Sequence, residues 1–152
     1  MPTFRFKFVV QASIEDVWKF YTDVNHLEII TPKEIDLKII RTSSQDITLG
    51  QEIWLSGKII ANRRNEWHSN ITFMKKYEYV DEMITGPFKT WKHSHKFKDL
   101  GGNGTEIIDE IQFELPYGIL GRLLQGYASN QLKKTFYHRK LATCNFLEKK
   151  LN

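Results

Sequence analysis

The sequence predicts an α+β fold in which a curved antiparallel sheet of about seven strands is wrapped around one long C-terminal helix. Three observations predict it. Runs of alternating polar and apolar residues recur at hairpin spacing between residues 35 and 114, and one further run opens the chain. From Ile119 onward the apolar residues instead recur near i, i+3 and i+4, as in a helix. Only that helix is large enough to cover the inner face of such a sheet, so we expect a cavity between them.

The opening strand runs from Thr3 to near Gln11, and its alternation is unlike the apolar core of a secretory signal. Ser13 follows as a helix N-cap, with acidic residues in the first turn. A second short helix is predicted from His26 to Ile30, before Thr31-Pro32. Six more strands are predicted, at Ile35–Arg41, Glu52–Ile60, Asn65–Met74, Tyr77–Ile84, Thr90–Lys98 and Thr105–Glu114.

The strand pattern ends at Pro116-Tyr117-Gly118, and the chain is predicted to be helical from Ile119 to about Lys150. Gly121 and Gly126 interrupt the start of this helix, where they can bend it or admit a close contact. The chain contains no internal repeat or linker. Residues 1–152 are therefore predicted to form one domain.

The segment from Trp91 to Phe97 carries the clearest functional signal. Its odd positions are Trp91, His93, His95 and Phe97, and its even positions are Lys92, Ser94 and Lys96. Successive side chains of a strand point to opposite faces, so both imidazoles are expected on the apolar, inward face. Because a buried polar group without a partner costs about 1–3 kcal/mol, these rings need partners inside the fold.

The next strand supplies one inward charge, Asp109. A hairpin symmetric about Gly101 would place His95 opposite Ile107 and His93 opposite Asp109, although a bulge in the glycine-rich loop would move this register. An internal neighbourhood of histidine and aspartate is predicted in either case.

Composition excludes several classes of protein. The chain is 41% hydrophobic and 26% charged, which is typical of a globular domain, and its net charge of +4 includes no basic run. We therefore expect no nucleic-acid partner. No segment approaches the roughly 20 apolar residues of a membrane span, so no integral membrane association is expected. The single cysteine, Cys144, excludes an internal disulfide and agrees with a cytoplasmic location.

The order of elements resembles the helix-grip fold of the START-like (SRPBCC) superfamily, which includes lipid-transfer START domains, birch-pollen-allergen-like proteins and polyketide cyclases. The matching motifs are Ile14 to Trp18, Gly86-Pro87-Phe88 with Trp91, His93, His95 and Phe97, then Asp109, Leu115-Pro116, and Phe136 with Arg139. They extend over nearly the whole chain and indicate a ligand-binding branch related to polyketide cyclase/dehydratase-like proteins. The resemblance implies a hydrophobic cavity but no single reaction, since the superfamily mixes carriers, receptors and enzymes.

The favoured function is binding of a small hydrophobic or lipid-like molecule between the sheet and the C-terminal helix, rather than catalysis. The alternative is an acid–base enzyme of the cyclase/dehydratase type, with His93 or His95 as acid–base and Asp109 orienting it. In a third interpretation the chain is an interaction module whose cavity is merely a packed core, and the histidines and Asp109 form a structural network. The predicted ligand-contacting residues are Trp67, Tyr79, Phe88, Trp91, His93, His95, Asp109, Tyr127, Phe136 and Arg139.

Several further features allow more than one interpretation. The His-x-His pattern with a carboxylate occurs in metal sites, but the pattern alone is weak, so no metal and no other cofactor is predicted. His68 is expected on the outer face, because Trp67 and Phe73 compete for the inner one. Arg139 either clamps an anionic head group or lies partly exposed along the core by its alkyl stem. The apolar residues Ile119, Leu120, Leu123 and Leu124 would gate the cavity, touch a membrane or pack on the sheet.

Overall fold

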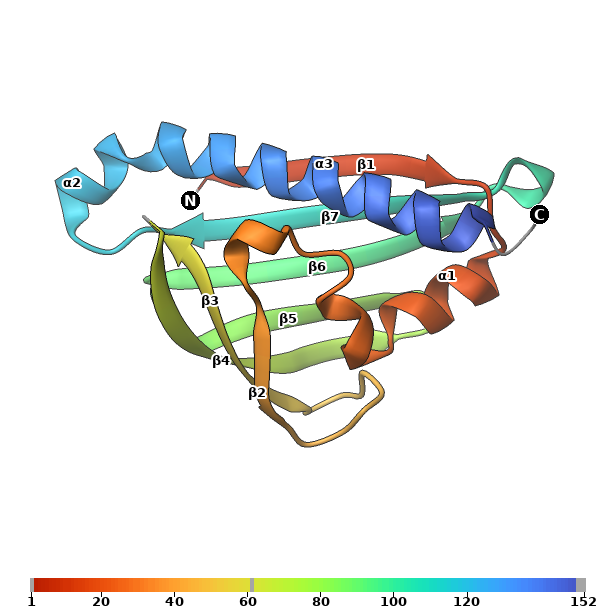
Figure 1. The fold of residues 1–152 in the computed structure, drawn as a ribbon, viewed down its shortest axis with the longest axis horizontal. Helices are drawn as coiled ribbons and strands as arrows, with labels where there is room; N and C mark the ends of the chain where they lie inside the picture. The colour runs from red at the N-terminus through yellow and green to blue at the C-terminus, as the bar shows by residue number, and fades with distance from the viewer. Residues whose placement is uncertain (1, 61, 150–152) are drawn as a thin grey trace.

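The computed structural model describes residues 2–60 and 62–149, and it confirms the helix-grip architecture. Seven antiparallel strands form one sheet in the order β1-β7-β6-β5-β4-β3-β2, and the long helix α3 (Gln125–Lys149) lies across its inner face (Figure 1). The strands are β1 (Thr3–Val10), β2 (Lys38–Thr42), β3 (Glu52–Ile60), β4 (Arg63–Lys75), β5 (Glu78–Thr85), β6 (Thr90–Asp99) and β7 (Thr105–Glu114). The strand predicted to carry the inward histidines is β6, and the strand predicted to carry the inward aspartate is its neighbour β7.

Short helical elements connect β1 to β2. The helix α1 (Ile14–Tyr21) begins as predicted, because the Ser13 hydroxyl accepts a hydrogen bond from the Asp16 amide. The predicted second helix at His26–Ile30 is instead the 3-10 helix η1 (Val24–Leu27), since the Asp23 side chain caps it earlier in the chain. A further 3-10 helix, η2 (Lys33–Ile35), ends at the left-handed Asp36, so β2 begins later than predicted.

The hairpin between β6 and β7 has a different register from the predicted one. His95 lies opposite Asp109 and His93 lies opposite Ile111, a shift of two residues. The cause is in the turn: β6 continues to Asp99, whose carboxylate accepts from the Gly101 amide and starts the 3-10 helix η3 (Gly101–Asn103). A two-residue shift leaves every side chain on its predicted face, so both imidazoles and Asp109 still point inward.

The core has two apolar clusters under α3, one around α1 and the sheet and a smaller one around Phe113 and Phe136. One residue predicted to be inward is not. A bulge between Ile71 and Phe73 turns the Phe73 side chain outward, where it is exposed, while Ile71 is buried. His68 lies on the outer face, stacked on Trp54 with ring centroids 4.3 Å apart.

The predicted C-terminal helix is two helices, α2 (Gly118–Leu123) and α3, separated at Leu124; the predicted end near Lys150 lies outside the described residues. Within α2, Gly121 admits the predicted close contact, because a Cβ at this position would collide with the carbonyl oxygen of Pro116. The apolar residues of α2 do not pack on the sheet, since Ile119 and Leu123 are each 76% exposed. Among the described residues, no helix has the length and apolar character needed to cross a membrane.

Gly104→Ala is expected to destabilise the protein by about 2 kcal/mol or more. Gly104 has a φ of +92°, and an added Cβ would collide with the carbonyl oxygen of Val10, where the β6–β7 turn meets the end of β1. Urea unfolding of Gly104→Ala and of a control, Gly102→Ala, measures the effect. In the same turn, Gly102 has open space around its Cα, so its substitution should be close to neutral. Equal effects of the two substitutions would contradict this account of the turn.

Candidate functional site

Four polar side chains from three adjacent strands meet on the inner face of the sheet. His93 and His95 come from β6, Asp109 from β7 and Asp81 from β5. The period of two along each strand brings them together, since Asp81 is the direct cross-strand neighbour of His93 and Asp109 that of His95. Asp109 is fully buried, and the two histidines are nearly so.

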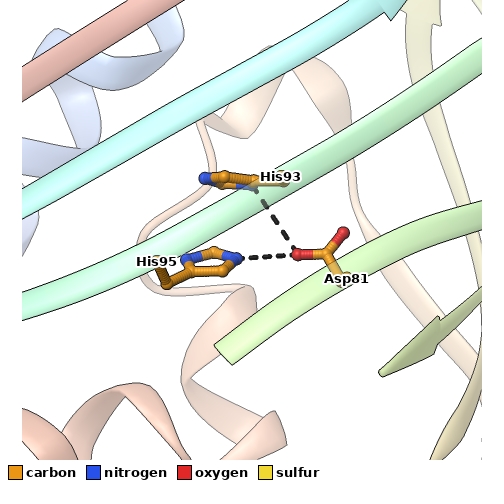
Figure 2. Close-up of side chains that lie close together, drawn as sticks. All are labelled: Asp81, His93 and His95. Atoms are coloured by element: carbon orange, nitrogen blue, oxygen red, sulfur yellow. Dashed lines mark hydrogen bonds and ion pairs between the residues drawn. The ribbon is translucent and has the colours of Figure 1, made fainter. Parts of the chain in front are cut away.

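Each imidazole lies between the two carboxylates. His93 Nε2 is 2.8 Å from Asp109 Oδ1, and His95 Nε2 is 2.7 Å from Asp81 Oδ2. The second nitrogen of each ring faces the other acid: His95 Nδ1 is 3.3 Å from Asp109 Oδ1, and His93 Nδ1 is 3.8 Å from Asp81 Oδ2. Figure 2 shows Asp81 pointing toward both rings from the neighbouring strand. The predicted histidine–aspartate neighbourhood is therefore present, with a second carboxylate added to it.

Arg139 joins this group from α3. Its Nε lies 3.5 Å from Asp109 Oδ2, and its guanidinium carbon lies 4.8 Å from the ring centroid of Tyr21. The head group is buried against the carboxylate, so the expectation of a partly exposed arginine is wrong. Arg139 connects the helix to the middle of the sheet by an ion pair.

Aromatic rings surround the two imidazoles. The Tyr79 ring stacks on His95 with centroids 4.2 Å apart, and His95 lies against His93 at 3.7 Å. Phe136 meets His93 edge to face at 5.6 Å. The column fixes the plane of each imidazole and therefore the direction in which its nitrogens point.

The pKa values of the two imidazoles shift in opposite directions. Burial lowers the pKa of His93 to about 4, with a further lowering from His95. Burial also lowers the pKa of His95, but hydrogen bonds with Asp109 and Asp81 outweigh it and leave that pKa raised. Burial alone would raise the pKa of Asp109, yet Arg139 and the histidines hold it well below its usual range. The raised pKa favours the protonated form of His95, whose charge together with that of Arg139 would offset the two carboxylates.

The protonation state of His95 decides which of two contacts its Nδ1 makes. The nitrogen lies 3.3 Å from Asp109 Oδ1 and also 3.3 Å from an Arg139 guanidinium nitrogen. When His95 is an imidazolium, Nδ1 donates to the carboxylate and has no lone pair for the arginine. The contact with Arg139 is then a close approach of two cations bridged by Asp109.

Asp81 is the member of this group that sequence reasoning missed. The alternation that placed the imidazoles inward also places Tyr79, Asp81 and Met83 on one face of β5. Tyr79 was predicted to face the cavity, and the same period of two would have marked Asp81. Burial raises the pKa of Asp81, but its hydrogen bond with His95 and the nearby cations lower it overall.

The ten predicted ligand-contacting residues divide between several places. His93, His95, Asp109, Arg139, Tyr79 and Phe136 are in or against the polar group, and Trp91 lies 6.4 Å from His93 between ring centroids. The Phe88 ring packs at a tilt against Trp91, with ring centroids 4.8 Å apart. Trp67 packs against the larger core cluster instead, and Tyr127 is more than half exposed on α3.

A pocket of about 550 Å³ opens beside α3, away from the imidazoles. It lies between one face of α3, the η2 segment, the end of β3 and Asn62, which directly precedes β4. Its lining residues are Pro32, Glu34, Ile35, Lys58, Ile59, Asn62, Tyr127, Gln131, Lys134, Thr135 and His138. Of the predicted contact residues only Tyr127 is among them. His138 is a second residue that the sequence reasoning missed, and its Nε2 is buried without a partner among the described residues.

A family model described as polyketide cyclase/dehydrase and lipid transport matches residues 10–136. The chain belongs to this family. The match includes the polar group up to Phe136 and ends three residues before Arg139. No curated protein sequence is significantly similar to the chain.

Solved structures with low sequence identity share the fold of this family member. A protein from Thermus thermophilus is 15% identical, with a TM-score of 0.78 and coverage of 99% of this chain and 100% of that one. A START superfamily protein from Mycobacterium smegmatis is 14% identical, with a TM-score of 0.75 and 97% coverage of both chains. The Zhui aromatase/cyclase from Streptomyces sp. R1128 is 16% identical, with a TM-score of 0.66 and coverage of 95% and 89%. These likenesses show the START-like fold.

Asp109→Asn is expected to lower the free energy of unfolding by about 3–5 kcal/mol, because it leaves Arg139 buried without its counter-charge. Urea unfolding at neutral pH measures the loss. The double variant Asp109→Leu/Arg139→Met is the control, since removing both charges together should restore much of the stability. A loss below about 1 kcal/mol in the single variant would show that the ion pair is not needed.

The stability of the protein is expected to fall as the pH decreases from about 6.5 to 4. In this interval His93 binds a proton in the unfolded chain but not in the folded one, because its folded pKa is about 4. The contribution of His93 to the free energy of unfolding is therefore complete above pH 6.5, and it is smaller by up to about 3 kcal/mol at pH 4. His95 acts oppositely, because its raised pKa stabilises the fold below about 6.5 and this stabilisation is lost at higher pH. Urea unfolding of wild type and His93→Gln across this range checks the assignment, and an unchanged acid slope in the variant would contradict it.

Proposed function

We propose that this family member binds a small amphipathic molecule, with an apolar body and a polar end, in the space between α3 and the sheet. The pocket beside α3 carries the proposal. Its volume of about 550 Å³ lies within the range of small-molecule sites. Apolar side chains such as Ile35 and Ile59 line it together with charged and amide groups, which is the mixture that an amphipathic molecule needs.

One face of α3 supplies the helix side of this pocket. Tyr127, Gln131, Thr135 and His138 recur at steps of three or four residues, so they form a single stripe. The adjacent stripe, which contains Phe136 and Arg139, faces the core. Gln131, Thr135 and the unpartnered His138 give the pocket hydrogen-bonding groups, which would fix the orientation of the bound molecule.

Several side chains on the inner face of the sheet are only partly buried. Trp67, Asp81, Met83 and Trp91 all keep intermediate exposure, although they lie on the face that α3 covers. Asp81 is 22% exposed, whereas its partners His93 and His95 are almost completely buried. A molecule that passes the pocket and reaches this surface would meet aromatic walls and one carboxylate. The cluster of Asp81, His93, His95 and Asp109 would then orient the polar end of the bound molecule.

The acid–base enzyme remains a prediction with weaker support. His93, His95 and Asp109 are not among the residues that line the pocket, and every imidazole nitrogen faces an internal carboxylate. A general acid or base must reach the proton that it transfers.

The cytoplasmic location and the lack of a nucleic-acid partner likewise stay predictions from composition.

Thr135→Trp is expected to weaken binding of the fluorescent amphipathic probe 1-anilinonaphthalene-8-sulfonate by about tenfold or more, since the indole would fill part of the pocket. Fluorescence titration of the purified protein measures the dissociation constant. Tyr137→Trp is the matched control, because residue 137 is exposed on the same helix and does not line the pocket. Equal affinity in both variants would place the probe elsewhere and contradict the proposal.

A further inference from the structure

We propose that Asp81, His93 and His95 form a binding site for a divalent first-row transition-metal ion such as Zn²⁺, Fe²⁺ or Co²⁺. The three residues offer ligand atoms that lie within 4.8 Å of one another (Figure 2). Two imidazole nitrogens with one carboxylate oxygen form a donor set that these ions accept. The site goes beyond the ligand binding proposed above and does not depend on it.

The distances around Asp81 fit a common ion with small adjustments. Metal–ligand bonds of about 2.0–2.2 Å place neighbouring ligand atoms about 3–3.5 Å apart. Here Asp81 Oδ2 is 2.7 Å from His95 Nε2 and 3.8 Å from His93 Nδ1. One separation must widen and the other must narrow, each by less than an ångström. The 3.8 Å separation is too long for a hydrogen bond, and an ion between the two atoms would bridge it.

Asp109 provides the outer support that metal-binding histidines use. A ligating imidazole normally donates its other N–H to a carboxylate or carbonyl, which fixes the tautomer and the ring direction. Both non-ligating nitrogens, His93 Nε2 and His95 Nδ1, face the same oxygen, Asp109 Oδ1, at 2.8 and 3.3 Å. Arg139 in turn holds the other Asp109 oxygen. The ligating nitrogens are thereby directed at Asp81, and binding of the ion would release the proton that a protonated His95 carries on Nε2.

The arrangement is that of an open site. Three protein ligands leave at least one coordination position of a transition-metal ion free. The ring stack of Tyr79, His95 and His93 closes one side, and both histidines are buried. Asp81 alone keeps 22% exposure, so the free position is on the side of Asp81, where solvent has access.

Cobalt titration of the untagged protein, after chelator treatment and dialysis, tests this site. We expect visible d–d absorption bands that saturate at one Co²⁺ per chain and are removed by Zn²⁺. Asp81→Asn keeps the side-chain shape and removes the charged ligand, so its affinity should fall by more than about 100-fold, beyond the usual effect of an outer-shell change. His93→Gln should give a similar loss.

His68→Gln is the matched control, because His68 also faces a carboxylate, Glu52, at 3.2 Å, but on the outer face of the sheet. Its cobalt affinity should equal that of wild type. Circular dichroism confirms that each variant is folded, and Asp81→Asn decides the test if His93→Gln does not fold. Lack of d–d bands in wild type, or an unchanged affinity in Asp81→Asn, would overturn the proposal.

Discussion

The ion pair between Asp109 and Arg139 is the constraint on which the rest of this structure depends. A carboxylate without solvent in the middle of a sheet is unstable unless cations compensate its charge. Arg139 compensates it from α3, at 3.5 Å, and the imidazoles compensate it from the neighbouring strand. The helix is therefore attached to the sheet at a fixed point along its length, and its apolar residues pack on both sides of that point. Tyr21 adds a second link, because its hydroxyl is 2.6 Å from the Thr143 hydroxyl on the next turn of α3.

The parts of the site that could be predicted from sequence follow from the period of two in a strand. Alternation alone placed His93, His95 and Asp109 on one buried face, and that placement holds although the predicted register was wrong by two residues. A two-residue slip changes which side chains are directly opposite, but it does not change faces. His93 still reaches Asp109, because diagonal neighbours on one face of a sheet are within reach of long side chains. The gripping helix was predictable from its apolar period, since only one long element could cover the sheet.

The parts that could not be predicted depend on local irregularities or on contacts between distant segments. The bulge at Phe73 reverses which side chains of β4 point inward beyond that position. The alternation of polar and apolar residues does not show where such a bulge occurs. The predicted helix divides at Leu124, although the residues predicted to interrupt it were Gly121, which lies within α2, and Gly126, which lies within α3. The pocket combines η2, the ends of two strands and a stripe of α3 whose polar residues look like an ordinary solvated face in sequence. Asp81 is different, because the alternation of side chains along β5 places it on the same face as Tyr79 and could have predicted its inward position.

The geometry of α3 connects the polar group to the pocket. Thr135 and His138 line the pocket, and the residues directly after them in sequence, Phe136 and Arg139, face the core. Adjacent residues of a helix differ in direction by about 100°, so the two stripes are neighbouring faces of one rigid element. A movement of α3 away from the sheet that widened the pocket would also lengthen the contact between Arg139 and Asp109. The cost of separating that buried pair opposes such a movement. The ion pair on one face of α3 therefore restrains the width of the pocket on the neighbouring face, even though no charged residue of that group lines it.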